Sequence, residues 1–83
     1  MNKDLSFTCV AAIGSMTLCL KAERILLSNG LQARVISLSP DQTRRGCAYG
    51  VAFPCAMHKN VASLLRAHKI SVSEYLTKER GVL

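Results

Sequence analysis

The clearest pattern in the chain is an alternation of apolar and polar positions close to its N-terminus. A period of two is that of a β-strand, and here it runs from Leu5 to Ile13. The more apolar face of this strand is expected to meet the helices. That face carries Leu5, Phe7, Cys9, Ala11 and Ile13.

Two later stretches show helical spacing instead. Ser15 is a suitable N-cap for a helix over residues 16–29, and Gly30 follows where a left-handed residue is favoured. A second helix is predicted over residues 57–69. The two buried stripes are expected to be Leu18, Ala22, Ile25 and Leu26, with Cys19 on or beside them, and Val61, Ala62, Leu64 and Leu65.

Three further strands are predicted over residues 31–38, 47–53 and 70–76, with a polar loop over 39–46. The order strand, helix, strand, strand, helix, strand predicts an α+β, ferredoxin-like βαββαβ sandwich with right-handed crossovers. We expect a four-stranded mixed sheet, in the order 4-1-3-2, with both helices on one face. A hairpin-edged sheet of the same class is the alternative.

The 83 residues suffice for one domain, with a core over about 5–76 and a frayed tail over 77–83. The apolar run from Leu5 to Leu20 resembles a signal peptide, but Asp4 precedes it and Gly14 interrupts it. The run is also too short to span a bilayer. We therefore expect a cytoplasmic protein.

The net charge of +6 favours acidic partners, anionic small molecules or nucleic acid. Basic and aromatic residues do not interleave as an RNA-stacking surface requires, so nucleic acid is not favoured. His58 and His68 lie ten residues apart, and no spacing typical of a metal site is present. We expect no metal and no bound cofactor.

Four cysteines, Cys9, Cys19, Cys47 and Cys55, are enough for two disulfides. The apolar pattern already provides a core, and Cys9 and Cys19 fall inside regular elements, so free thiols in a reducing compartment are the favoured interpretation. Cys9 and Cys19 are expected in the core. Cys55 follows Pro54 at the end of the sheet opposite Cys47.

Cys47 stands out because of where the topology places it. The end of the first strand, the start of the first helix, the end of the second strand and the start of the third share one end of the predicted sheet. Arg44, Arg45 and Gly46 precede Cys47, and the helix amides near Ser15 and Met16 lie at the same end. Cations and helix N-termini lower the pKa of a thiol and so favour the reactive thiolate. The alternative is that Cys47 is a small apolar residue at the start of a strand.

The segment Ser39-Pro40-Asp41-Gln42-Thr43-Arg44-Arg45-Gly46-Cys47-Ala48-Tyr49-Gly50-Val51-Ala52-Phe53 resembles the small bacterial selenium/sulfur-carrier-like proteins. The resemblance extends from the first strand through Tyr75 and carries the family's cysteine onto Cys47. Ala48 stands where many members are expected to have glycine. The resemblance implies a carrier that takes a persulfide or selenopersulfide from a desulfurase-like donor and passes it to an acceptor by thiol exchange.

Two other classes compete with the carrier. A non-catalytic ferredoxin-like module would bind RNA or acidic proteins through its basic surface. A metallochaperone of this fold needs two cysteines in the first loop, where this chain has Gly14-Ser15-Met16-Thr17. A homodimer through an open, apolar sheet face is also predicted. Its lining would be Val10, Ala12, Ala48, Gly50, Ala52, Ile36 and Leu38.

Overall fold

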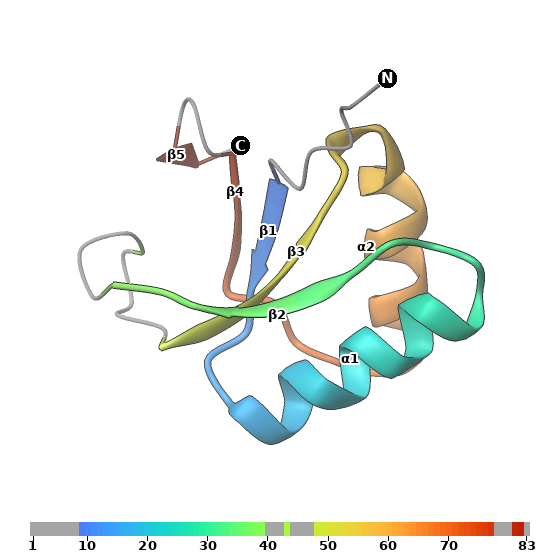
Figure 1. Cartoon of the computed structure of the whole chain (residues 1–83), viewed down its shortest axis with the longest axis horizontal. Coiled ribbons are helices and arrows are strands. Elements are labelled where there is room, and N and C mark those ends of the chain that lie inside the picture. Colours follow the sequence, from blue (N-terminus) through green and yellow to red (C-terminus); the bar gives the residue numbers. More distant parts are fainter. Residues whose placement is uncertain (1–8, 40–42, 44–47, 78–80, 83) are drawn as a thin grey trace.

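Five short strands and two helices make up the fold in a computed structural model that describes residues 9–39, 43, 48–77 and 81–82 (Figure 1). The two helices are α1 (Met16–Ser28) and α2 (His58–Ala67), and a 3-10 turn, η2 (Cys55–Met57), leads into α2. The strands are β1 (Cys9–Ala12), β2 (Arg34–Ser37), β3 (Tyr49–Phe53), β4 (Glu74–Thr77) and β5 (Gly81–Val82). The chain is thus α+β, as predicted.

The strands form one sheet in the order β2-β3-β1-β4-β5. Every neighbouring pair is antiparallel, so the prediction of a mixed sheet is wrong. The reason is that each helical crossover joins strands that are not neighbours. Strand β3 lies between β1 and β2, and β1 lies between β3 and β4. An intervening strand then runs opposite to both of its neighbours.

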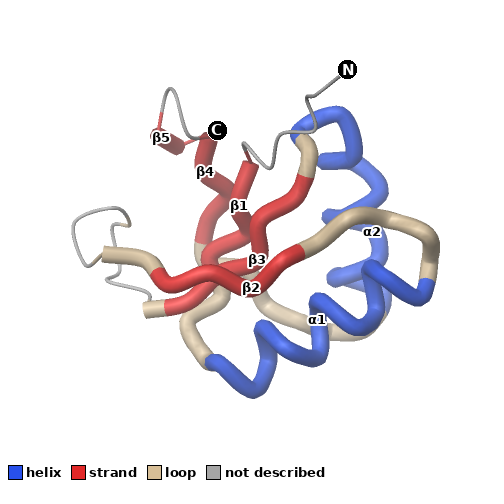
Figure 2. Tube along the Cα trace, viewed as in Figure 1, coloured by secondary structure: helices blue, strands red, loops and turns tan. Residues whose placement is uncertain are grey.

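Both helices cover the same face of this sheet (Figure 2). In an antiparallel pair, residues directly opposite each other point to the same side, and Cys9 is opposite Phe53 while Ala11 is opposite Val51. These four residues belong to one buried cluster with residues of α1 and α2. The alternation in β1 therefore predicted the helix-facing side correctly.

The buried stripe of α1 is rotated from the predicted one. It consists of Cys19, Ala22 and Leu26, whereas Leu18 is 38% exposed and Ile25 is only partly buried. Spacings of three and four residues place Cys19, Ala22 and Leu26 on one line. Two of the three are small, so the helix backbone can lie close to the sheet. In α2, Val61 and Leu65 are buried as predicted.

The sheet face away from the helices is less open than expected. Ala12 and Leu38 are buried and form a second small cluster with Val10 and Ile36. Gly50 and Ala52 are buried as well. The single chain therefore already shields much of the apolar surface on which the predicted homodimer depended.

The end of the chain also differs from the expected frayed tail over 77–83. Thr77 belongs to β4, and Gly81–Val82 forms β5, whose residues pair with Leu76 and Thr77. A strand of two residues has too little periodicity to be recognised in a sequence.

The two helices end in the same hydrogen-bonding pattern but use different residues at its left-handed position. At the end of α1, Leu31 N–H donates to Leu26, and the left-handed residue is Gly30 with φ of 79°. At the end of α2, Ile70 N–H donates to Leu65, and the left-handed residue is Lys69 with φ of 59°. Both are Schellman ends, and a side chain at this position is strained where glycine is not.

We expect Lys69→Gly to stabilise the protein by about 0.5–1 kcal/mol, since it removes that strain. Gly30→Ala should destabilise it by about 1 kcal/mol, because the left-handed conformation alone penalises the new Cβ, which would meet nothing within 4 Å. Chemical denaturation measures the free energy of unfolding of both variants. The control is Lys21→Gly on the exposed side of α1, which should cost about 1 kcal/mol. Equal destabilisation by both Lys→Gly changes would contradict this account.

Gly50 is required for a different reason, which is close packing. A Cβ built on Gly50 would lie 2.8 Å from the Ala11 carbonyl oxygen and 2.9 Å from Val10 Cγ1. Because one of these atoms is backbone, β1 would have to move. We expect Gly50→Ala to destabilise the protein by about 1–3 kcal/mol, with Ala52→Gly as a comparison at the neighbouring position of the same face. A neutral Gly50→Ala variant in thermal unfolding would show that β1 and β3 are less closely packed.

Candidate functional site

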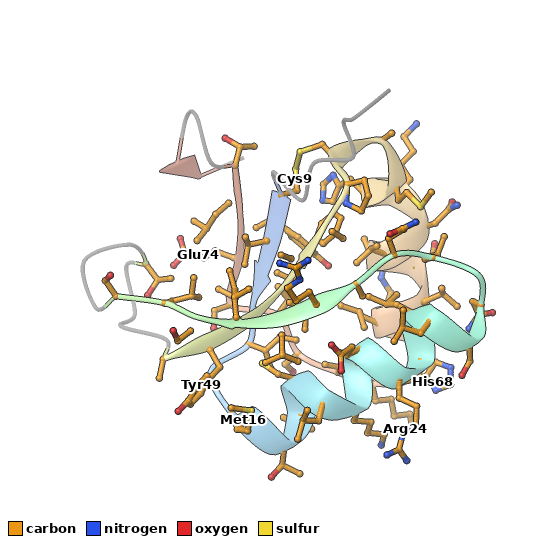
Figure 3. All side chains as sticks on the ribbon, viewed as in Figure 1. Cys9, Met16, Arg24, Tyr49, His68 and Glu74 are labelled. Carbon is orange, nitrogen blue, oxygen red and sulfur yellow. A yellow bond between two sulfur atoms is a disulfide. The ribbon has the colours of Figure 1, made fainter. Side chains whose placement is uncertain are left out.

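The end of β1, the start of α1, the end of β2 and the start of β3 meet at one end of the sheet, as the topology predicted. The Tyr49 carbonyl accepts the N–H of Ile13 at 3.1 Å and that of Gly14 at 2.8 Å, which joins the start of β3 to the turn before α1. The N–H of Leu38 donates to the Ala48 carbonyl at 2.8 Å, which joins the end of β2 to the same place. Figure 3 shows Tyr49 and Met16 at this end of the molecule.

The start of α1 is held by its own cap. Ser15 adopts an extended conformation, and its Oγ accepts the N–H of Leu18 at 3.3 Å. In helix geometry the N–H groups of Met16 and Thr17 precede the first intrahelical bond and point out of the helix end. The first turn contains no acidic residue, and Met16 is 40% exposed. This end of α1 is therefore accessible and favourable to a negative charge.

The residues at the centre of the predicted site are Cys47, Arg44, Arg45 and Gly46, and all four lie outside the described residues. Their roles stay predictions. What the structure does provide is the surroundings at both ends of the segment: Ser39 follows β2, and the exposed Ala48 precedes β3.

A disulfide joins Cys9 to Cys55, with their Cα atoms 5.0 Å apart (Figure 3). The expectation of free thiols is therefore wrong for these two residues. The register explains the contact, because Cys9 is directly opposite Phe53, and Pro54 then turns the chain so that Cys55 returns over the start of β1. The pairing therefore follows from the register of β1 and β3, which the sequence pattern alone does not give.

The bond closes a long loop, since the two cysteines are 46 residues apart in sequence. Loop closure of this length stabilises a folded chain by up to about 4 kcal/mol in the chain-entropy description. Cys9 is 1% exposed and belongs to the main core cluster, as predicted, whereas Cys55 is exposed. The two sulfur-bearing residues thus have very different access to solvent.

Three aromatic rings contact one another, two from residues near Cys55 in sequence, Phe53 and His58, and one from Tyr75 of β4. The His58 ring is stacked on Phe53 with centroids 6.2 Å apart and meets Tyr75 edge-on at 4.7 Å. Burial raises the pKa of Tyr75, and the nearby Arg66 guanidinium partly opposes this shift. The His58 side chain is half-buried in this group.

The remaining described cysteine, Cys19, is fully buried in α1 and is not part of a disulfide. This confirms its predicted place in the core. Of the three cysteines that the structure describes, two are bonded to each other and the third is shielded from solvent.

The described basic side chains share one property, which is exposure. Six Lys and Arg residues are exposed, and the two acidic ones in the same part of the chain are half-buried. The basic residues are Lys21, Arg24, Arg34, Lys59, Arg66 and Lys69. One of the acids, Glu23, accepts the Val35 N–H at 3.2 Å and so serves the contact between α1 and β2. The surface therefore attracts anions.

Two further properties concern metals and membranes. Among the residues that the structure describes, no three His, Cys, Asp or Glu side chains come close enough together to hold a metal ion. Within the same residues, neither helix has the length and the apolar character needed to cross a bilayer.

Taken together, the fold and its sulfur atoms define a small, basic α+β protein with a cysteine loop between two antiparallel strands. The chain belongs to the family described as "Putative Se/S carrier protein-like", whose model matches residues 8–76. The match includes four of the five strands, both helices and all four cysteines. Neither the curated proteins nor the solved structures contain a significant match to this chain.

Proposed function

We propose that the protein carries sulfur or selenium as a persulfide or selenopersulfide on Cys47. The observation that carries this proposal is the state of the other three cysteines. Cys9 and Cys55 are bonded to each other, and Cys19 is buried, so none of them offers a thiol at the surface. The description of the chain's family as Se/S carrier protein-like supports a carrier role.

The covalent chain supports a position for Cys47 near the start of α1. Cys47 is two residues before Tyr49, so their Cα atoms are at most about 7 Å apart. Tyr49 is bonded to Ile13 and Gly14, immediately before the cap residue Ser15. In this proposal the outward-pointing amides of Met16 and Thr17 and the side chains of Arg44 and Arg45 stabilise the thiolate, and Gly46 lets a partner approach.

The proposed transfer is a thiol exchange without net oxidation. The Cys47 thiolate attacks the terminal sulfur or selenium of a donor persulfide. The bond between that atom and the donor cysteine breaks, and the donor leaves as a thiolate that takes up a proton. Cys47 then holds the extra atom until an acceptor thiolate attacks it in the same way. No bound cofactor takes part.

The strand order also supports a ferredoxin-like assignment, with the strands β2-β3-β1-β4 alternating with two helices on one face. The partners of such a carrier would be a cysteine desulfurase-like donor and an acceptor protein, met in the cytoplasm. The exposed basic residues favour acidic docking surfaces on both. Self-association through the sheet face stays a prediction.

A non-catalytic binding module is the second candidate, because the six exposed basic residues would also attract RNA. Measuring RNA binding and sulfur transfer on the same protein separates the two functions. Tight RNA binding that weakens steeply with salt, without any sulfur transfer to the chain, would replace the carrier proposal with this one.

Incubation with a cysteine desulfurase and cysteine should add the mass of one sulfur atom to the protein, at Cys47, since that thiol is the accessible one. Intact mass and peptide mapping give the readout. Cys47→Ser should abolish the addition, and Cys19→Ser, at a buried thiol, should keep it. Sulfur that persists in Cys47→Ser would assign the chemistry to another cysteine.

Replacing Arg44 and Arg45 by Ala should slow the alkylation of Cys47 at neutral pH by roughly threefold to tenfold, because less thiolate is present. The estimate takes about 0.3–0.7 kcal/mol for each neighbouring charge. Brief treatment with limiting iodoacetamide across a pH series measures it. Lys21→Ala with Arg24→Ala is the matched control, since it removes the same charge from the outer side of α1. Equal slowing in both double variants would mean that only net charge matters.

A further inference from the structure

We propose that the Cys9–Cys55 bond is a second sulfur-exchange site, separate from Cys47, in which Cys55 is the sulfur attacked by incoming thiols and Cys9 is the resolving cysteine. The observation behind it is an exposed cysteine at the start of a helical segment, bonded to a cysteine in the core. The proposal does not depend on Cys47 carrying sulfur.

Access to solvent decides which of the two sulfur atoms an incoming thiol can attack. A thiolate breaks a disulfide by attacking one sulfur along the bond, so that the other sulfur leaves. Cys9 is 1% exposed and is packed in the core, whereas Cys55 belongs to an exposed turn. An incoming thiol can therefore reach Cys55, and Cys9 becomes the leaving group.

The electrostatic setting of Cys55 favours a thiolate at this residue. It is the first residue of the helical run formed by η2 and α2, which continues to Ala67. Unlike α1, this run begins without a side-chain cap, and neither η2 nor α2 has an acidic residue in its first turn. Within these two first turns, no acidic side chain neutralises the positive end of the helix dipole. A thiolate released at Cys55 is stabilised there, as thiolates at helix starts are in general.

The side chains of His58 and Lys59 lie one turn further along the same helical run. The N–H of His58 donates to the Cys55 carbonyl, which closes a 3-10 turn. In such a turn, residues three apart lie one above the other. His58 is therefore on the Cys55 side, where Phe53 and Tyr75 hold its ring, and the exposed Lys59 follows it. Lys59 attracts an anionic thiol to this end of α2.

The balanced reaction uses two thiols. The first attacks Cys55 Sγ, the bond to Cys9 breaks, and Cys9 Sγ leaves with the electron pair and takes up a proton. Cys55 now holds a mixed disulfide. Either Cys9 attacks Cys55 Sγ and restores the original bond, or a second thiol attacks the bound thiol's own sulfur. The second route releases reduced Cys55 and a small-molecule disulfide, so that two thiols are oxidised and one protein disulfide is reduced.

The length of strand β3 separates this site from the site proposed around Cys47. Cys9 is opposite Phe53, at the far end of β3 from Tyr49. Four residue steps along a strand span about 13 Å. Cys55 and Cys9 therefore lie near the opposite end of β3 from the residues that adjoin Cys47 in sequence.

The test uses the full chain with Cys47→Ser, so that its outcome is independent of the carrier proposal. In this background we compare Cys9→Ala with Cys55→Ala after incubation with oxidised glutathione, by intact mass and peptide mapping. Folded Cys9→Ala should form a glutathione adduct on Cys55 at least tenfold faster than Cys55→Ala forms one on Cys9. Lys59→Gln added to Cys9→Ala should slow the reaction, and Lys21→Gln should not.

A second measurement covers the case in which either variant fails to fold. The oxidised chain with Cys9 and Cys55 intact is treated with limiting reduced glutathione, quenched with acid and mapped. The mixed disulfide should be found on Cys55. Adducts on Cys9, equal rates in the two variants, or a bond that is reduced only after denaturation would overturn the proposal. Sulfur loading of Cys47 in the unaltered protein is measured separately and could still succeed.

Discussion

The pairing of β1 with a strand on each side is the interaction on which the rest of the structure depends. All four residues of β1 pair with β3 on one side and with β4 on the other. Removing β1 would leave β2 and β3 separated from β4 and β5. Its side chains are small where the layers meet: Cys9 and Ala11 face the helices, and Cys19 and Ala22 of α1 face back. Small residues in the shared core cluster let α1 lie close to the sheet. The hydrogen bonds from Ile13 and Gly14 to the Tyr49 carbonyl hold the start of α1 beside β3.

Much of this arrangement could be predicted from periodicity. The alternation in β1 gave the helix-facing residues, and Ser15 and Gly30 marked the ends of α1 correctly. Hydrophobicity alone predicts Leu18 in the core, but its position on α1 leaves it partly exposed. The sheet is close enough that the line Cys19, Ala22 and Leu26 packs better than a stripe of larger residues. A pattern of residue types cannot measure that distance.

The chemical features were harder to predict than the fold. The disulfide depends on which residues of β1 and β3 are opposite each other, and a register that placed Cys9 opposite Val51 instead of Phe53 would have separated Cys9 from Cys55. The role of His58 depends on two rings, one from β3 and one from β4, that are distant in sequence. By contrast, the convergence around Tyr49 followed from strand order alone, because strand ends are fixed once the order is known. Register and contacts between distant side chains are the information that a single sequence lacks.

The loop closed by the disulfide also affects how the chain responds to force. Residues 10–54 lie between the two bonded cysteines, so tension applied at the two ends of the chain passes from Cys9 directly to Cys55. Strands β1, β2 and β3 and helix α1 are then shielded, and only the parts of the chain outside the loop, before Cys9 and after Cys55, can be extended. An unfoldase that pulls the chain from one end must thread more than one strand of backbone when it reaches the Cys9–Cys55 bond. The oxidation state of a single bond therefore sets whether the protein can be pulled through a narrow pore as one strand or only as a doubled one.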